Sequence, residues 1–188
     1  PNLEYSLIDE NEFPLGIHSL KYHFIKQVYQ DKEKENDFVY WGSKKDDGRH
    51  EIIKEIKNKI PTQLYGYMSF KSSNKWMSMK DLVPLLSRSK YTLCFNTTSV
   101  GFTSRYNEAL AHKIIPFVWK DYDINSDIVS DEYLRVHSVE ELLKKINHLE
   151  YTKTRESFLQ KIINKYEQKQ CMHKEMYDLF SNKLKKLL

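Results

Sequence analysis

Glycine and proline are both scarce in this chain, with five of each among 188 residues. A collagen-like repeat or a low-complexity disordered chain would contain many more of them. No apolar run approaches the roughly 20 residues that a membrane-spanning helix needs, and the first residues do not resemble a signal peptide. The composition therefore favours a globular protein that does not enter a membrane.

Cysteine is rarer still. Cys94 lies in a strand-like run and Cys171 in a helical one, and two residues so placed give neither a disulfide framework nor a zinc-binding spacing. The seven histidines show no HxH or HExxH pattern, so we expect no metal site built from protein ligands. We expect a reducing, cytoplasmic setting.

Apolar and aromatic residues are plentiful by comparison. Hydrophobic residues make up 40% of the chain, with 13 Tyr and 9 Phe, which is ample for the core of one domain. The formal net charge of +4 is mildly basic. It permits a phosphate-rich partner without requiring one, because many of the lysines fall on the solvated faces of expected helices.

Short apolar runs alternate with helical patterns from Asp37 onward. We expect strands at 38–41, 63–67, 91–95, 114–118 and 133–136, and helices at 49–59, 78–86, from 104, at 139–149 and at 154–188. This alternation predicts a Rossmann-like α/β fold, a parallel sheet flanked by helices with further C-terminal helices. We expect residues 1–36 to be a lead-in or interdomain linker with a short helix, 37–150 the Rossmann-like domain, and 151–188 the C-terminal helices.

The stretch SRYNEALAHKIIPFVW, from Ser104 to Trp119, carries the strongest local signal. Arg105 and Glu108 lie three residues apart near the start of a helix and so share one face. A helix N-terminus favours anions, and a guanidinium group binds phosphate oxygens through two parallel hydrogen bonds. The glutamate could accept from two adjacent hydroxyls such as those of a ribose. The alternative is a surface ion pair between the two side chains.

The loop GSKKDDGR, from Gly42 to Arg49, places small residues directly after a strand and basic residues before a helix. It has neither the glycine spacing of a dinucleotide fingerprint nor the ending of a P-loop. Alone, it could be a polar turn with solvated lysines. In a parallel sheet, however, this loop and Arg105 come to the same carboxyl edge, where ligands bind. Two basic elements that converge there suit a diphosphate.

In this order, the pattern resembles the carboxyl-terminal, donor-binding domain of GT-B glycosyltransferases. Among them it is most similar to the phage DNA β-glucosyltransferases, which glucosylate 5-hydroxymethylcytosine. The resemblance runs from about Asp37 to Leu149 and is strongest in DFVYWGSKKDDGR, SMKDLVPLLSRSKYTLCF and RYNEALAHKIIPFVWKDYD.

The resemblance implies a UDP-sugar donor, UDP-glucose first among them, and a role for each matching residue. Arg105 and Arg49 would contact the diphosphate, Glu108 the ribose hydroxyls, Gly42 and Ser43 would form the close-approach loop, and Tyr65, Gly66 and Met79 would lie near the nucleoside. At one phosphate position Lys44 or Lys45 replaces the family's arginine. Lysine keeps the charge but lacks the forked geometry, so we expect weaker donor binding. A Mg²⁺ or Mn²⁺ ion would arrive with the diphosphate.

The same resemblance implies an enzyme that transfers glucose to a hydroxymethylated base in double-stranded phage DNA, in the host cytoplasm. No Asp or Glu in this chain has a persuasive claim to be the catalytic base, which in this family belongs to an amino-terminal domain. We therefore expect the chain to work with such a domain or a partner subunit. The C-terminal helices could pack on that domain or serve ordinary core packing.

Other interpretations stay open. The chain could be a non-catalytic α/β module that binds a nucleotide or a partner, or a GT-B transferase whose acceptor is a lipid or polysaccharide. The basic segment 71–80, KSSNKWMSMK, could touch a DNA backbone or be a solvated loop. Trp41, Trp76 and Trp119 are more typical of core or rim aromatics than of base-stacking platforms.

Overall fold

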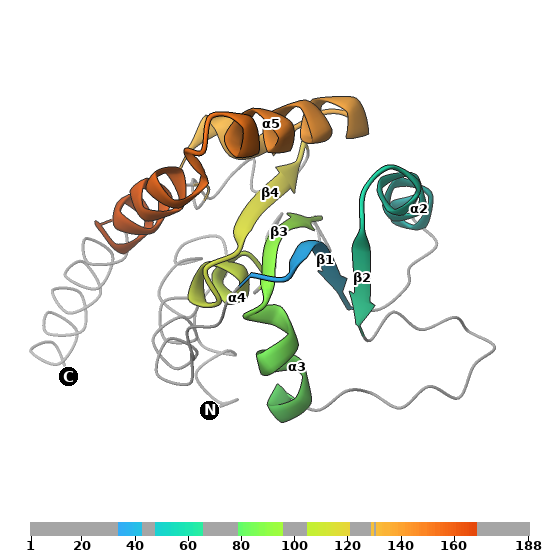
Figure 1. Cartoon of the computed structure of the whole chain (residues 1–188), viewed down its shortest axis with the longest axis horizontal. Helices are drawn as coiled ribbons and strands as arrows, with labels where there is room; N and C mark the ends of the chain where they lie inside the picture. Colours follow the sequence, from blue (N-terminus) through green and yellow to red (C-terminus); the bar gives the residue numbers. More distant parts are fainter. Residues whose placement is uncertain are drawn as a thin grey trace, which may run out of the picture.

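A computed structural model describes residues 34–42, 48–65, 79–95, 105–120, 129 and 131–168. Within these ranges, five parallel strands form one sheet in the order β2-β1-β3-β4-β5 (Figure 1). The strands are β1 (Asn36–Trp41), β2 (Thr62–Tyr65), β3 (Ser89–Cys94), β4 (Ile115–Trp119) and β5 (Arg135–Val136). The expected parallel α/β sheet is confirmed. The helix expected before residue 34 and the helical pattern after residue 168 lie outside the described residues.

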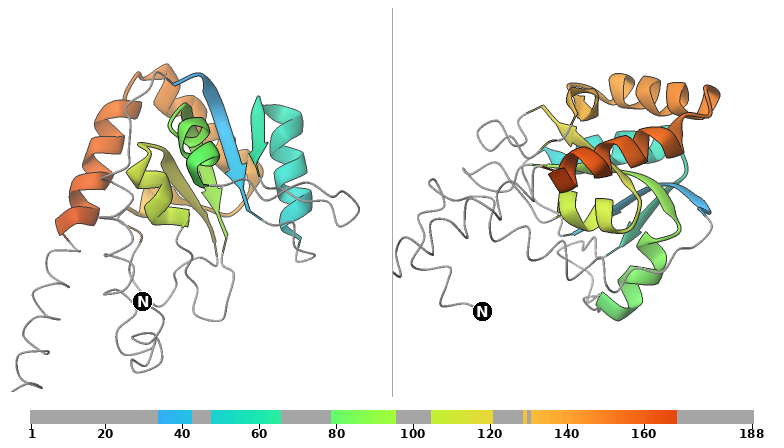
Figure 2. Two further views of the ribbon diagram at one scale, coloured as in Figure 1. Left: turned by 90° about the horizontal axis from the view of Figure 1, so that it is seen from below. Right: turned by 90° about the vertical axis from the view of Figure 1, so that its left-hand side faces the viewer.

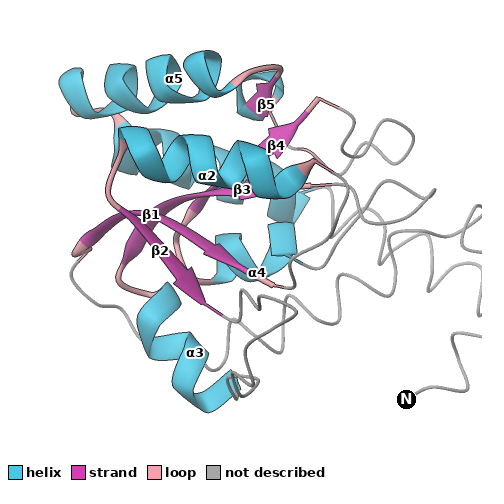
Figure 3. Ribbon diagram, turned by 90° about the vertical axis from the view of Figure 1, so that its right-hand side faces the viewer, coloured by secondary structure: helices cyan, strands magenta, loops and turns pink. Residues whose placement is uncertain are grey.

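Helices cover both faces of the sheet. They are α2 (Arg49–Lys59), α3 (Met79–Leu86), α4 (Arg105–Ala111) and α5 (Val139–Tyr151), and a further helix spans 155–168. Helices α2 and α5 lie on one face, and α3 and α4 lie on the other (Figure 3). The helix at 155–168 runs beside α4 (Figure 2), where the Tyr166 hydroxyl donates to Oδ1 of Asn107 at 2.6 Å. The molecule is therefore a layered α/β/α domain.

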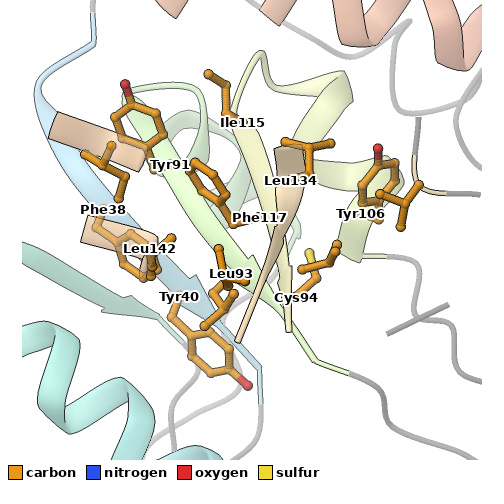
Figure 4. Close-up of a cluster of buried hydrophobic side chains, with 14 of the residues drawn as sticks. Phe38, Tyr40, Tyr91, Leu93, Cys94, Tyr106, Ile115, Phe117, Leu134 and Leu142 are labelled. Atoms are coloured by element: carbon orange, nitrogen blue, oxygen red, sulfur yellow. The ribbon is translucent and has the colours of Figure 1, made fainter. Parts of the chain in front are cut away.

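The pleat of β1 divides the core between these two layers. Phe38 and Tyr40 belong to the cluster that includes residues of α2 and α5 (Figure 4), whereas Val39 and Trp41 pack with residues of α3 and α4. Period-two alternation along a strand sends successive side chains to opposite faces. A strand whose residues are all buried, such as β1 at its carboxyl end, must therefore be covered on both sides.

Pro116 occupies an inner strand without breaking the sheet. It stands opposite Thr92 of β3, and the pairing of β4 with β5 begins two residues later, at Val118. At Pro116, β4 pairs with β3 but not yet with β5, so the missing N–H of proline costs no hydrogen bond to β5. The apolar run around it, 114–118, is fully buried as expected.

The strand expected at 133–136 is only half right. Residues Glu132–Leu134 form a 3₁₀ turn, and only Arg135 and Val136 join the sheet. The Asp131 side chain accepts from the backbone N–H of Tyr133 at 3.1 Å, which caps the turn and holds the residues before Arg135 out of an extended conformation. The expected cap of α5 is confirmed, since Ser138 accepts from the N–H of Glu141 at 3.1 Å.

A buried histidine makes the fold sensitive to acid. Burial lowers the pKa of His112 from 6.5 to about 4, with the Lys34 charge contributing in the same direction. The folded protein therefore holds this ring neutral, while the unfolded chain takes up a proton below its ordinary pKa. Stability is full above about pH 6.5 and falls as the pH drops toward 4, by up to about 3 kcal/mol for this group.

We expect His112→Gln to flatten this part of the pH profile. The measurement is the free energy of unfolding in urea between pH 4 and 7, compared with the parent chain. His148→Gln, at an exposed histidine of α5, is the control and is expected to follow the parent curve. Identical slopes for the parent and His112→Gln would show that His112 does not carry the effect.

Candidate functional site

The strand order reverses between β1 and β3. The chain passes from β1 to its neighbour β2 on one side, and β3 then pairs with β1 on the other. Beyond the carboxyl ends of these two strands, the chain continues to α2 on one face of the sheet and to α4 on the opposite face (Figure 3). In doubly wound sheets this switch point is where ligands bind. The site is therefore sought at the ends of β1 and β3.

Arg105 is the first residue of α4 and lies at that edge. Its guanidinium carbon is 5.3 Å from the centre of the Tyr40 ring and 5.8 Å from that of Trp41. The ring faces stabilise the charge, but they do not accept in-plane hydrogen bonds. Nε and Nη1 are buried and have no hydrogen-bond partner among the described residues. Buried, unpaired donors are costly, and a bound anion would satisfy them.

Gly42 leaves the room that this guanidinium occupies. The residue follows β1 directly and has a φ of +126°, which L side chains rarely adopt. A Cβ built on Gly42 would collide with Nη2 and Cζ of Arg105. The backbone conformation therefore favours glycine here, and any larger residue would also displace the Arg105 guanidinium.

Glu108 does not pair with Arg105, although the two lie one helical turn apart. Its Oε2 accepts instead from the indole Nε1 of Trp41 at 2.9 Å, and none of the ion pairs among the described residues joins Glu108 to Arg105, whose Nε and Nη1 have no partner there. The interpretation of a surface ion pair is therefore wrong.

Burial raises the pKa of the Cys94 thiol to about 12, while the charge of Arg105 lowers it and that of Glu108 raises it. Both charges thus act at the end of β3, and the thiol stays protonated at neutral pH.

Arg49 reaches the same edge from the other face. It is the first residue of α2, is only 8% exposed, and lies 5.6 Å from the centre of the Phe95 ring. Phe95 packs edge-on against Tyr40 at 6.0 Å, and Tyr40 in turn carries Arg105. Adjoining aromatic rings therefore contact two arginines that begin helices on opposite faces of the sheet.

The structure brings together four of the residues singled out in the sequence: Gly42, Arg49, Arg105 and Glu108. Two others are placed by their backbone only, since Tyr65 ends β2 and Met79 begins α3. Ser43, Lys44, Lys45, Gly66 and the segment 71–78 lie outside the described residues. The roles given to all of these residues stay predictions.

Sequence reasoning missed the aromatic lining formed by Tyr40, Trp41 and Phe95. It placed Trp41 among the core or rim aromatics, and the ring is indeed only 5% exposed. Its indole N–H nevertheless bonds to a carboxylate, and its ring contacts a guanidinium. The available signal was position, because Tyr40 and Trp41 end β1 and Phe95 directly follows β3, at the edge where Arg49 and Arg105 lie.

The amino-terminal edge of the sheet looks different. Lys90 forms an ion pair with Asp37 at 2.9 Å, and the Tyr91 hydroxyl donates to Glu150 at 2.8 Å. Lys34 donates to two backbone carbonyl groups nearby. The polar groups named here thus bond to other protein groups, as expected of an edge that stabilises the fold and binds no ligand.

The described ranges contain neither a metal-binding cluster nor a membrane-spanning helix. No group of three or more His, Cys, Asp or Glu side chains there could hold a metal ion. No helix in the same ranges has both the length and the apolar character to cross a bilayer.

Solved structures of a DNA-glucosylating enzyme share this fold, although no family model and no curated protein matches the sequence. T4 phage β-glucosyltransferase with UDP and Mn²⁺ matches with a TM-score of 0.62 at 16% identity, over 82% of this chain and 49% of the enzyme. Its complex with UDP-glucose matches with a TM-score of 0.60 at 18% identity, over 82% and 50%.

A further structure, of the DNA-modifying enzyme β-glucosyltransferase with and without uridine diphosphoglucose, gives a TM-score of 0.66 at 16% identity, over 84% of this chain and 55% of the enzyme. The suspected resemblance is confirmed for the fold. This chain has the Rossmann-like architecture expected for one half of a GT-B enzyme, and it spans about half the length of the enzymes it matches.

Proposed function

We propose that this chain is the donor-binding half of a glycosyltransferase and that it binds a UDP-sugar, UDP-glucose in particular, at the carboxyl edge of β1 and β3. The observation that carries the proposal is the Arg105 guanidinium, which lies over two rings and against Gly42 with two buried N–H groups unpaired. A diphosphate oxygen is the kind of acceptor that would complete it. The similarity of the fold to enzymes solved with UDP and UDP-glucose supports the same ligand.

The proposed chemistry separates the sugar from the nucleotide. As the bond between the anomeric carbon and the diphosphate oxygen breaks, negative charge collects on the departing UDP. Arg105 and Arg49 are fixed in advance on aromatic rings and would stabilise that charge without having to reorganise. Glu108 would accept from the ribose hydroxyls and orient the nucleoside. Gly42 would let the backbone approach the phosphates closely.

We assign the catalytic base and the acceptor of the sugar to groups outside this chain. We propose that an amino-terminal domain or separate subunit supplies the carboxylate that takes the acceptor's proton, because no side chain described here fits that task. We propose a hydroxymethylated base in double-stranded DNA as the acceptor and the host cytoplasm as the setting. A Mg²⁺ or Mn²⁺ ion would accompany the diphosphate rather than occupy a protein-built cluster.

Glucose transfer tests the proposal. Radiolabelled UDP-glucose is incubated with duplex DNA containing 5-hydroxymethylcytosine, using this chain alone and then this chain together with the proposed amino-terminal domain or subunit. We expect label in DNA only with both halves, and none when the duplex carries unmodified cytosine. Donor binding without transfer by the joined protein would favour a nucleotide-binding module. Transfer to a lipid or polysaccharide instead would redirect the acceptor assignment.

Gly42→Ala is expected to weaken UDP binding roughly tenfold, because the added Cβ pushes the Arg105 guanidinium away from its rings. Gly48→Ala is a matched control. Gly48 also has a positive φ, of 83°, but its Cβ would meet no atom within 4 Å. Both variants therefore carry backbone strain, and only the first displaces Arg105. Calorimetric titration with UDP measures the difference, and equal losses in the two variants would contradict the proposed role.

A further inference from the structure

We infer that Trp41 is a positioning residue for the nucleotide site, holding Glu108 in place for the ribose and apart from Arg105. This inference rests on the proposed function and deepens it. The Trp41 indole contacts both α4 side chains to which we assign the nucleotide, through its N–H group to Glu108 and its ring to Arg105.

The Trp41 ring is itself firmly held. It is the last residue of β1, is 5% exposed, and belongs to a buried cluster that spans β1, α3 and α4. The other members of that cluster are Val39, Leu82, Leu86, Ala109 and Ile114. A large aromatic side chain packed on several sides has little freedom to rotate. Its N–H group therefore points in a fixed direction.

That N–H donates to Oε2 of Glu108 at 2.9 Å. Indole is a donor only, so it can align a carboxylate without competing for an incoming donor. With Oε2 held, Oε1 stays available to accept from a sugar hydroxyl. This bond also fixes α4 relative to β1, because Trp41 ends the strand and Glu108 lies on the helix. The contact of the Tyr40 ring with Arg105 joins the same two elements.

The same bond prevents an unproductive alternative. Glu108 and Arg105 are three residues apart on one helix, where opposite charges ordinarily pair. A Glu108 carboxylate released from Trp41 could swing to Arg105 and satisfy the N–H groups that a diphosphate needs. In the structure the two do not pair, and Trp41 is the partner that Glu108 has instead. The tryptophan thus keeps one residue for the ribose and the other for the phosphates.

Trp41→Phe tests this inference, because phenylalanine keeps an aromatic face under Arg105 and removes the N–H group. We expect UDP affinity of the 188-residue chain to fall roughly fivefold to tenfold. Preference for UDP over 2′-deoxy-UDP should shrink as well, since Glu108 is no longer aligned with the hydroxyls. In a Glu108→Ala background, Trp41→Phe should cause no further loss, because its effect passes through Glu108.

Trp119→Phe is the matched control. Trp119 ends the next-but-one strand and packs on Phe95 at 5.9 Å, but it makes no described bond to Glu108. We expect this variant to keep the preference for UDP over 2′-deoxy-UDP. Equal losses of UDP and 2′-deoxy-UDP affinity in Trp41→Phe, or a further loss in the Glu108→Ala background, would overturn the positioning role and leave the proposed function standing.

A second measurement does not depend on how well Trp41→Phe folds. With Trp41 left in place, the resonance of its indole N–H is expected to differ between the parent chain and Glu108→Ala, and to move in the parent chain when UDP is added. A Trp41 resonance that responds to neither would contradict the inference. A well-folded parent chain that fails to bind UDP at all would overturn the proposed function and the inference together.

Discussion

Arg105→Ala is expected to weaken UDP binding by roughly tenfold to hundredfold. A charge-assisted hydrogen bond contributes about 1.5–3 kcal/mol, and each 1.4 kcal/mol corresponds to about a tenfold change in affinity. Arg105 presents two buried donors that have no partner among the described residues, so their loss would remove the proposed phosphate contacts and breaks no described hydrogen bond. Calorimetric titration of parent and variant with UDP gives the ratio.

Two further variants sharpen that measurement. Arg105→Lys keeps the charge but not the fork, and we expect it to recover only part of the affinity. Arg88→Ala removes the same charge at the amino-terminal edge of the sheet, where Arg88 pairs with Glu35 at 3.3 Å, and it should bind UDP like the parent. If Arg88→Ala lost as much affinity as Arg105→Ala, the effect would be one of overall charge and not of a built site.

Phe117→Ala is expected to lower the free energy of unfolding by about 3–5 kcal/mol, close to the whole stability of many domains. Phe117 is fully buried in β4, pairs with Leu93 of β3, and lies near the Tyr91 ring at 6.1 Å. Truncating it removes apolar area and leaves a cavity at the centre of the sheet (Figure 4). Chemical denaturation followed by circular dichroism measures the change.

Tyr151→Ala provides the comparison for that experiment. Tyr151 ends α5 and is 89% exposed, so its truncation should change stability by no more than about 0.5 kcal/mol. A small loss at Phe117 together with a larger one at Tyr151 would contradict the placement of Phe117 in the hydrophobic core.

Local patterns were enough to predict the regular elements. Helix α2 runs from Arg49 to Lys59 as expected, because isoleucines recur at helical spacing and Pro61 follows its end. The stretch around β4 was equally clear, since an uninterrupted apolar run implies a strand covered on both faces. Apolar periodicity does not predict the 3₁₀ turn at Glu132–Leu134, because that turn depends on one polar side chain. Asp131 caps it by accepting from the backbone N–H of Tyr133.

The site could be predicted only in part, for a related reason. Sequence spacing correctly put Arg105 and Glu108 on one helix turn, but spacing alone also allowed them to pair. Which partner each takes depends on Trp41 and Tyr40, which lie on β1, far away along the chain. Such contacts arise from the order of the strands in the sheet. The resemblance predicts a close approach of Gly42 to a phosphate, and the structure adds that its missing side chain makes room for Arg105.

A crystal structure of the chain with UDP would show whether the donor binds at the proposed site. We expect the diphosphate beyond the carboxyl ends of β1 and β3, with phosphate oxygens on the Arg105 guanidinium and ribose hydroxyls on Glu108. Glu108 should still accept from the Trp41 indole in that complex. UDP bound at another place, or a diphosphate that leaves Arg105 without a phosphate contact, would contradict the proposed donor site.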